Sequence, residues 1–238
     1  MTLLSVVQAV ADEVKDTRPT GVVSSSDPTV QLFYRLANRV GKALMKKVAW
    51  QALRTEKTFT ALSTETQTGI LPSDFDRFVP ETFWDRTNKF LVTGPISAVQ
   101  WQSLKALSYS GSERKFILRG GSILTIPAFT GGEALAFEYV SNLWAESSGG
   151  TGQTAFSADT DVSRIDEELI VRGMKYCYLT DEGLPNGAAA QDFNDYFDDV
   201  LSNDQPTSNV MVAADIFSGT STRHFGGAPF STGAGDLF

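Results

Sequence analysis

The spacing of apolar residues changes twice along this chain of 238 residues, and that change limits the fold more than any other feature. Residues 2–16 and 28–54 repeat apolar side chains at intervals of three and four, which predicts amphipathic helices. From Lys57 apolar and polar residues alternate, as they do in β-strands, and helical spacing returns at Ile165. We expect an α+β fold, with a helical-bundle body, an inserted small antiparallel β domain and an extended C-terminal arm.

The predicted domains are residues 1–56 and 158–204 for the helical body, 57–157 for the inserted β-rich domain, and 205–238 for the arm. Within the insertion, paired glycines separate residues 115–119 from 122–126, which predicts a two-residue hairpin. A short helix over 97–107 interrupts the strands, and the last helix is expected over 188–202. The expected core of the insertion consists of Phe83, Trp84, Ile117, Ile126, Phe137 and Tyr139.

The C-terminal segment differs in composition from the rest of the chain. It is rich in glycine, serine and threonine, and such a segment cannot offset its ordering entropy by burying its own apolar surface. We expect it to be disordered in the free subunit and to become an extended arm on a partner surface. The isolated apolar anchors of this arm are Val210, Met211, Val212, Ile216, Phe217, Phe225, Phe230, Leu237 and Phe238.

Charge is divided unevenly along the chain. Residues 1–57 carry nine Lys and Arg against five Asp and Glu, whereas residues 158–204 carry three against twelve. We expect the basic second helix to meet acidic C-terminal helices of the same or an adjacent subunit. An alternative is that the basic residues line a channel and face DNA. The basic stripe comprises Arg35, Arg39, Lys42 and Lys46, and the acidic face comprises Asp192, Asp195, Asp198 and Asp199.

The residues offer little for catalysis or for metal and cofactor binding. His224 is the single histidine and Cys177 the single cysteine, so neither a Ser-His-Asp triad nor a zinc cluster is expected. The acidic runs 166–168 and 198–199 could be solvated or ion-paired helix faces, or the two carboxylates of a glycan hydrolase. We expect no catalytic residue, no metal and no cofactor. No apolar run reaches the ~20 residues that a membrane span needs, so we expect a soluble protein made in the cytoplasm.

Several short motifs occur in a fixed order between Ile70 and Trp144. They are Leu71-Pro72-Ser73-Asp74-Phe75-Asp76-Arg77-Phe78, Phe83-Trp84-Asp85-Arg86-Thr87, Gly94-Pro95-Ile96-Ser97, Trp101-Gln102-Ser103-Leu104-Lys105-Ala106-Leu107, Arg119-Gly120-Gly121, Ile126-Pro127-Ala128 and Leu135-Ala136-Phe137-Glu138-Tyr139-Val140-Ser141. This ordered set resembles the head-to-tail adaptor (connector) proteins of tailed bacteriophages, the ring subunits that dock under the portal. The resemblance covers roughly residues 1–203.

The resemblance implies a structural virion protein at the head-to-tail junction. It implies a homo-oligomeric ring, commonly a dodecamer, that contacts the portal protein above and tail or nozzle proteins below. DNA would pass through the central channel without sequence-specific binding, and no membrane would be involved. The arm corresponds to the family's C-terminal extension in position and composition only. A related tail-ring protein, such as a stopper or tail-tube subunit, and a cell-wall glycan hydrolase are the alternatives.

Overall fold

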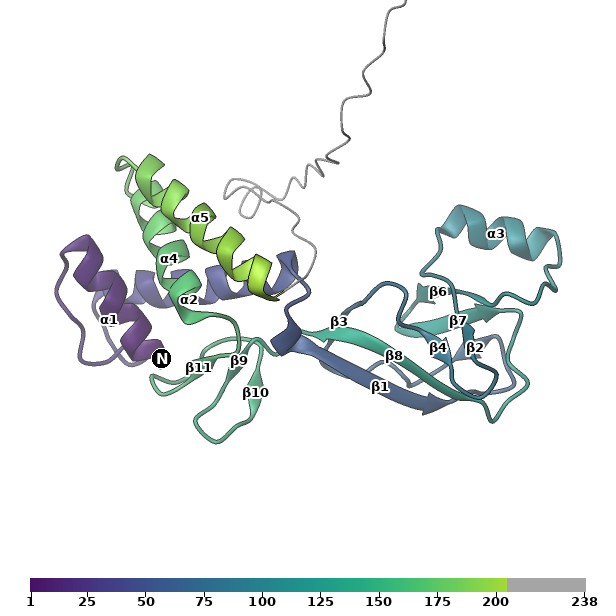
Figure 1. Cartoon of the computed structure of the whole chain (residues 1–238). Helices are drawn as coiled ribbons and strands as arrows, with labels where there is room; N and C mark the ends of the chain where they lie inside the picture. The colour runs from purple at the N-terminus through teal and green to yellow at the C-terminus, as the bar shows by residue number, and fades with distance from the viewer. Residues whose placement is uncertain (205–238) are drawn as a thin grey trace, which may run out of the picture.

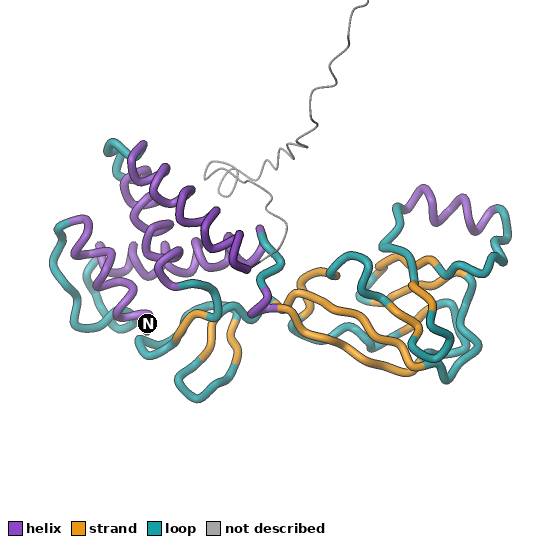
Figure 2. The backbone as a smooth tube through the Cα atoms, viewed as in Figure 1, coloured by secondary structure: helices purple, strands orange, loops and turns teal. Residues whose placement is uncertain are grey.

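The structure is a computed structural model that describes residues 1–204. The two ends of the described chain form a helical body, and an elongated β-rich part projects from it along strands β1 and β8 (Figure 1, Figure 2). The α+β fold with an antiparallel β insertion is therefore confirmed. The predicted arm, 205–238, lies outside the described residues.

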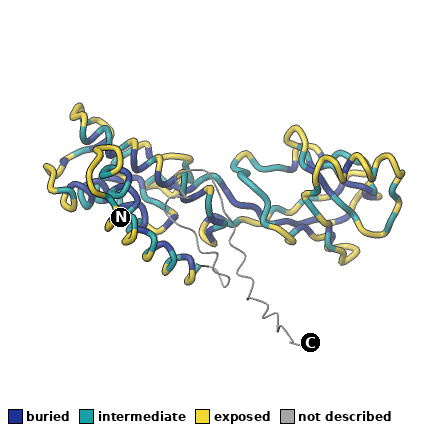
Figure 3. The backbone as a smooth tube through the Cα atoms, turned by 90° about the horizontal axis from the view of Figure 1, so that it is seen from above, coloured by how far each residue is buried: buried dark blue, intermediate teal, exposed yellow. Residues whose placement is uncertain are grey.

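Four helices make up the body, and α4 contacts each of the other three. Buried apolar residues from all four helices form one continuous core, and Figure 3 marks the buried residues as dark blue stretches along the helices. Since the helices come from both ends of the described chain, the body closes only when those ends meet. The four helices are α1 (Leu3–Val14), α2 (Pro28–Lys47), α4 (Glu167–Asp181) and α5 (Gly187–Asp204).

A three-stranded sheet packs against this body. Trp144, which precedes it, donates its indole N–H to the Thr154 carbonyl at 2.8 Å and is fully buried. The ring lies against Gly41 of α2, where a Cβ atom would stand 2.2 Å from a ring carbon, so only glycine fits. Trp144 and Phe156 thereby join the helical core. The strands are β9 (Ala145–Glu146), β10 (Gly152–Gln153) and β11 (Val162–Ser163). The predicted domain boundaries remain a prediction.

The largest sheet is antiparallel throughout and is centred on β8 (Ala134–Ser141). β1 (Arg54–Thr60) pairs with one edge of β8 over its whole length, in a register without a bulge. β3 (Phe75–Phe78) and β4 (Trp84–Asp85) share the other edge, and β5 (Phe90–Leu91) pairs with β4. This arrangement leaves β1 at one edge of the sheet and β5 at the other.

The distal part of the insertion contains the predicted hairpin and short helix. β6 (Lys115–Arg119) and β7 (Ser122–Ile126) are joined by Gly120 and Gly121 at φ of 56° and 73°, which confirms the hairpin. β2 (Thr66–Gln67) pairs with β7, and α3 (Ala98–Ala106) lies nearby. A cluster of aromatic rings fills the space between the sheets. It includes Phe78, Phe83, Phe116 and Phe137.

Two details of the prediction were wrong. The second helix was expected to reach Arg54, but it ends at Lys47 and β1 starts at Arg54. The indole N–H of Trp50 folds back onto the Leu44 carbonyl at 2.9 Å and satisfies an acceptor that a longer helix would have used. Trp84 was expected in the core but is 45 % exposed. Neighbouring strand residues face opposite sides, so buried Phe83 leaves its neighbour outside.

Candidate subunit and partner interfaces

Helix α2 separates apolar and basic residues onto opposite faces. Its start is fixed by Asp27, whose carboxylate accepts the Thr29 N–H at 2.8 Å, and by Pro28 in the first turn. Val30, Phe33 and the other apolar residues of the helix enter the core. The predicted basic stripe is wholly exposed, and consists of Arg35, Arg39, Lys42 and Lys46.

The basic stripe borders an open groove of about 640 Å³. The wall opposite α2 is formed by Asp76, by Asn142 after β8, and by Thr154. The Asn142 side-chain oxygen is buried and has no hydrogen-bond partner among the described residues. The groove is therefore positive on the helix side, with polar groups on the other side. Its α2 residues are Asn38, Arg39, Lys42, Met45 and Lys46.

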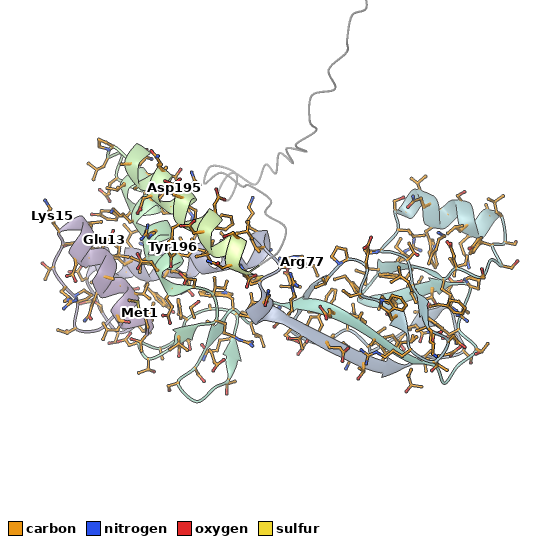
Figure 4. All side chains as sticks on the ribbon, in the orientation of Figure 1. Met1, Glu13, Lys15, Arg77, Asp195 and Tyr196 are labelled. Atoms are coloured by element: carbon orange, nitrogen blue, oxygen red, sulfur yellow. The ribbon has the colours of Figure 1, made fainter. Side chains whose placement is uncertain are left out.

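Arg77 fixes the junction at the end of this groove, where the helical body meets the β-rich part (Figure 4). Its guanidinium donates to the carbonyls of Met45 at 3.1 Å and Val48 at 2.7 Å, which lie at the open end of α2. It also pairs with Asp76 at 2.5 Å. A cation at a helix C-terminus satisfies acceptors that the helix leaves unpaired and also complements its dipole.

Only one of the four aspartates on the acidic face of α5 forms an ion pair within the described part of the subunit. Asp192 pairs with Arg172 of α4 at 2.5 Å. Asp195, Asp198 and Asp199 form no ion pair with any residue in the described range. Burial, together with the charges of Asp195 and Asp199, raises the pKa of the Asp198 carboxyl above its ordinary value. This end of α5 therefore carries concentrated negative charge, and Figure 4 shows Asp195 on the helix.

The basic stripe and the acidic face scarcely meet inside one subunit. Arg39 pairs with Asp181 of α4 at 3.5 Å, and the two side chains are 55 % and 40 % exposed. Within residues 1–204, Arg35, Lys42 and Lys46 form no ion pair. The subunit thus presents cations on α2 and anions on α5 that its own fold leaves unmatched.

The acidic run 166–168 serves the structure of α4. Asp166 caps the helix by accepting the Leu169 N–H at 2.9 Å. Glu167 pairs with the N-terminal amine of Met1, and Glu168 pairs with Arg172 at 2.9 Å. The described residues contain no cluster of three or more acidic, cysteine or histidine side chains that could hold a metal. No helix in the described part is both long and apolar enough to cross a membrane.

Sequence analysis missed Arg77 and Arg172 as organising residues. The sequence does hint at Arg77, because Asp76 and Arg77 are charged residues between two phenylalanines. Charged residues in such a short apolar stretch need partners close to the sheet. Arg172 gives no comparable signal, since its partner Asp192 lies on another helix. The nine anchors predicted for the arm lie outside the described residues.

A family model described as SU10 adaptor protein matches residues 1–215. The chain belongs to the SU10 adaptor protein family. The match spans every described helix and strand of this adaptor, so the assignment covers both the helical body and the β insertion. The resemblance to phage head-to-tail adaptors is thereby confirmed. No curated protein matches the adaptor's sequence.

Proposed function

We propose that this adaptor forms a homo-oligomeric ring, a dodecamer, at the head-to-tail junction of a tailed phage. The ring joins the portal protein to tail or nozzle proteins and lets DNA pass through its channel. Membership of the adaptor family supports this role. The observation that carries the ring is the set of unmatched charges on α2 and α5.

The two charged surfaces suit a head-to-tail contact between identical subunits. In such a ring each subunit presents one surface to one neighbour and the complementary surface to the other. The groove beside α2 offers Arg39, Lys42 and Lys46, and α5 of the next subunit supplies Asp195 and Asp199. Exposed pairs are each worth only ~0–1 kcal/mol, yet they set register and association rate when repeated around a ring.

Charge reversal tests this contact. The double variant Lys42→Glu, Lys46→Glu should lose assembly at low salt, and so should Asp195→Lys, Asp199→Lys. Mixing the two variants should restore rings, because alternating subunits recover opposite charges at every interface. Lys89→Glu is the matched control, since Lys89 is exposed on the β4–β5 turn away from α2. Ring formation with the portal is measured by negative-stain imaging and sedimentation.

The alternative for the basic stripe is the channel wall. If the Lys42→Glu, Lys46→Glu ring assembles normally at low salt, the interface proposal fails and the stripe is assigned to DNA. Impaired DNA passage in virions that carry this variant would then be expected, because the reversed charges repel phosphates.

We also propose that residues 205–238 attach the adaptor to the portal or to a neighbouring adaptor subunit. Apolar anchors separated by glycine and serine suit a series of separate pockets. Deleting the residues after Asn209 should leave the body folded, as measured by circular dichroism, and abolish stable attachment to the portal. Full-strength attachment by the truncated chain would contradict this assignment.

The role is structural in this proposal, without catalysis. Glu168 is held by Arg172 and Asp199 lies on an exposed helix face, so neither has the enclosed environment that a glycosidase acid requires. Cell-wall hydrolysis by the pure protein that disappears in Glu168→Gln or Asp199→Asn would overturn it.

A further inference from the structure

One edge of strand β1 pairs with no strand in the described part of the chain. Arg54–Thr60 pairs with β8 through seven consecutive residues, and within residues 1–204 no strand pairs with its other edge (Figure 1). A long, flat edge strand presents unpaired N–H and C=O groups and acts as a template for another strand. Such an edge is usually covered by a partner or interrupted by a bulge, and the β1–β8 register contains no bulge.

The side chains of β1 indicate what kind of strand would fit beside it. Phe59 lies on the inner face, with its ring 6.0 Å from Phe83 and 6.1 Å from Phe137. It is only partly buried, so the aromatic core is open on the flank that faces away from β8. Thr58 and Glu56 on the other face are exposed. Thr55 and Lys57 share the face of Phe59, so an added strand would place an apolar residue beside Phe59 and tolerate mixed residues elsewhere.

One segment of the chain beyond the described residues has this pattern. Val210, Val212, Ala214 and Ile216 are apolar at every second position from 210 to 216, a run equal in length to β1. β-Branched residues, which favour strands, make up three of these four. The intervening positions are Met211, Ala213 and Asp215, so Asp215 is the one polar residue of the run. An antiparallel register that sets Ala213 opposite Thr58 places Val212, Ala214 and Ile216 on the face of Phe59, so the segment suits the free edge in length and β-propensity.

We propose that residues 210–216 of one subunit add as an antiparallel strand to the free edge of β1 in the neighbouring subunit. The proposal rests on the ring put forward above and names an acceptor for the first part of the arm. Asp204 lies beside Gln51, whose backbone N–H donates to its carboxylate at 3.1 Å. The chain thus leaves the body near the beginning of its own β1, and the shortest route onto that strand is parallel to it.

A neighbouring subunit removes that restriction. Every described pair in this sheet is antiparallel, and antiparallel pairing is slightly more stable per residue. The six residues from Asp204 to Val210 can span up to ~20 Å when extended, which lets the segment leave its own subunit. Strand addition supplies backbone hydrogen bonds along the whole edge, and the alternate side chains set the register.

Disulfide trapping tests the donated strand. Ala213→Cys, at the centre of the segment, is mixed with a second protein that carries Thr58→Cys on the outer face of β1. After assembly on the portal protein and mild oxidation, a disulfide-linked dimer is expected on non-reducing gels. The native Cys177 is buried and does not compete. Ser103→Cys on α3, exposed and distant from β1, replaces Thr58→Cys in the matched control and should give no dimer.

The outcomes separate the possible occupants. A chain carrying both cysteines that cross-links only within itself places the segment on its own β1 and overturns the proposal. Assembled rings without any cross-link, including with Glu56→Cys to allow for a shifted register, overturn it as well and leave the adaptor role intact. Failure of the wild-type chain to assemble on the portal would instead refute the proposed function.

A proline variant checks the backbone contribution. Val212→Pro removes one N–H donor and should abolish the Ala213–Thr58 cross-link, whereas Val212→Ile keeps the strand and should preserve it. Cross-linking that survives Val212→Pro unchanged would mean that the segment does not pair as a strand.

Discussion

Replacing Arg77 with alanine should destabilise the subunit through the end of α2. The side chain donates to two carbonyls at that helix terminus and pairs with Asp76. Hydrogen bonds to a charged group contribute about 1.5–3 kcal/mol each, but Arg77 is 31 % exposed, so water replaces part of what is lost. We expect the free energy of unfolding to fall by ~2–3 kcal/mol in total.

Urea unfolding followed by circular dichroism measures this loss. Arg77→Lys should retain part of the stability, because an ammonium group keeps the charge but cannot reach two carbonyls with a planar fork. Arg119→Ala is the control, since Arg119 is exposed and forms no ion pair in the described part of the chain. A loss below ~0.5 kcal/mol for Arg77→Ala, the size of an ordinary surface substitution, would refute the reasoning.

Three further predictions concern the helical body. Gly41→Ala should destabilise it by ~1–3 kcal/mol in urea unfolding, because the new methyl group overlaps the Trp144 ring, whereas Gly187→Ala, with open space around it, should not. Burial raises the pKa of the Cys177 thiol to about 11 from 9.0, so it should resist thiol reagents in the folded protein. The stability that this protonated thiol contributes is fully present below pH 9 and declines towards pH 11; the decline should be smaller in Cys177→Ala. The pKa of the Asp198 carboxyl is also raised, so holding this group ionised at pH 7 destabilises the folded subunit. Asp198→Asn should therefore raise the urea midpoint of unfolding at pH 7 and weaken ring assembly. A lower midpoint would contradict the charge argument.

Short stretches of the sequence were enough to predict most of the helices and strands. Periodicity located the helices, and Gly120-Gly121 located a hairpin, since both signals depend on neighbouring residues alone. The end of α2 was not predictable in this way, because it depends on the return of the Trp50 indole to Leu44 and on Arg77 from a distant strand. The exposure of Trp84 required the strand register.

The candidate interfaces show the same limit. The composition of the basic stripe and the acidic face could be read from charge and helical spacing. The groove beside α2 could not, because much of its far wall comes from Asn142 and Thr154, about a hundred residues away in sequence. The free edge of β1 likewise follows from which strands pair, and alternation along a single strand does not reveal its neighbours.

The origin of the body from both ends of the described chain has a consequence during synthesis. About 120 residues separate the end of α2 from the start of α4, the helix against which α1 and α2 pack. At a translation rate of about 5–20 residues per second, α4 is synthesised on the order of ten seconds after α2. The apolar faces of α1 and α2 that pack on α4 stay exposed during that time. The β insertion emerges in that interval with both β1 and β8 and can pair first. We therefore expect the nascent adaptor to pair β1 with β8 while the faces of α1 and α2 that pack on α4 are still exposed.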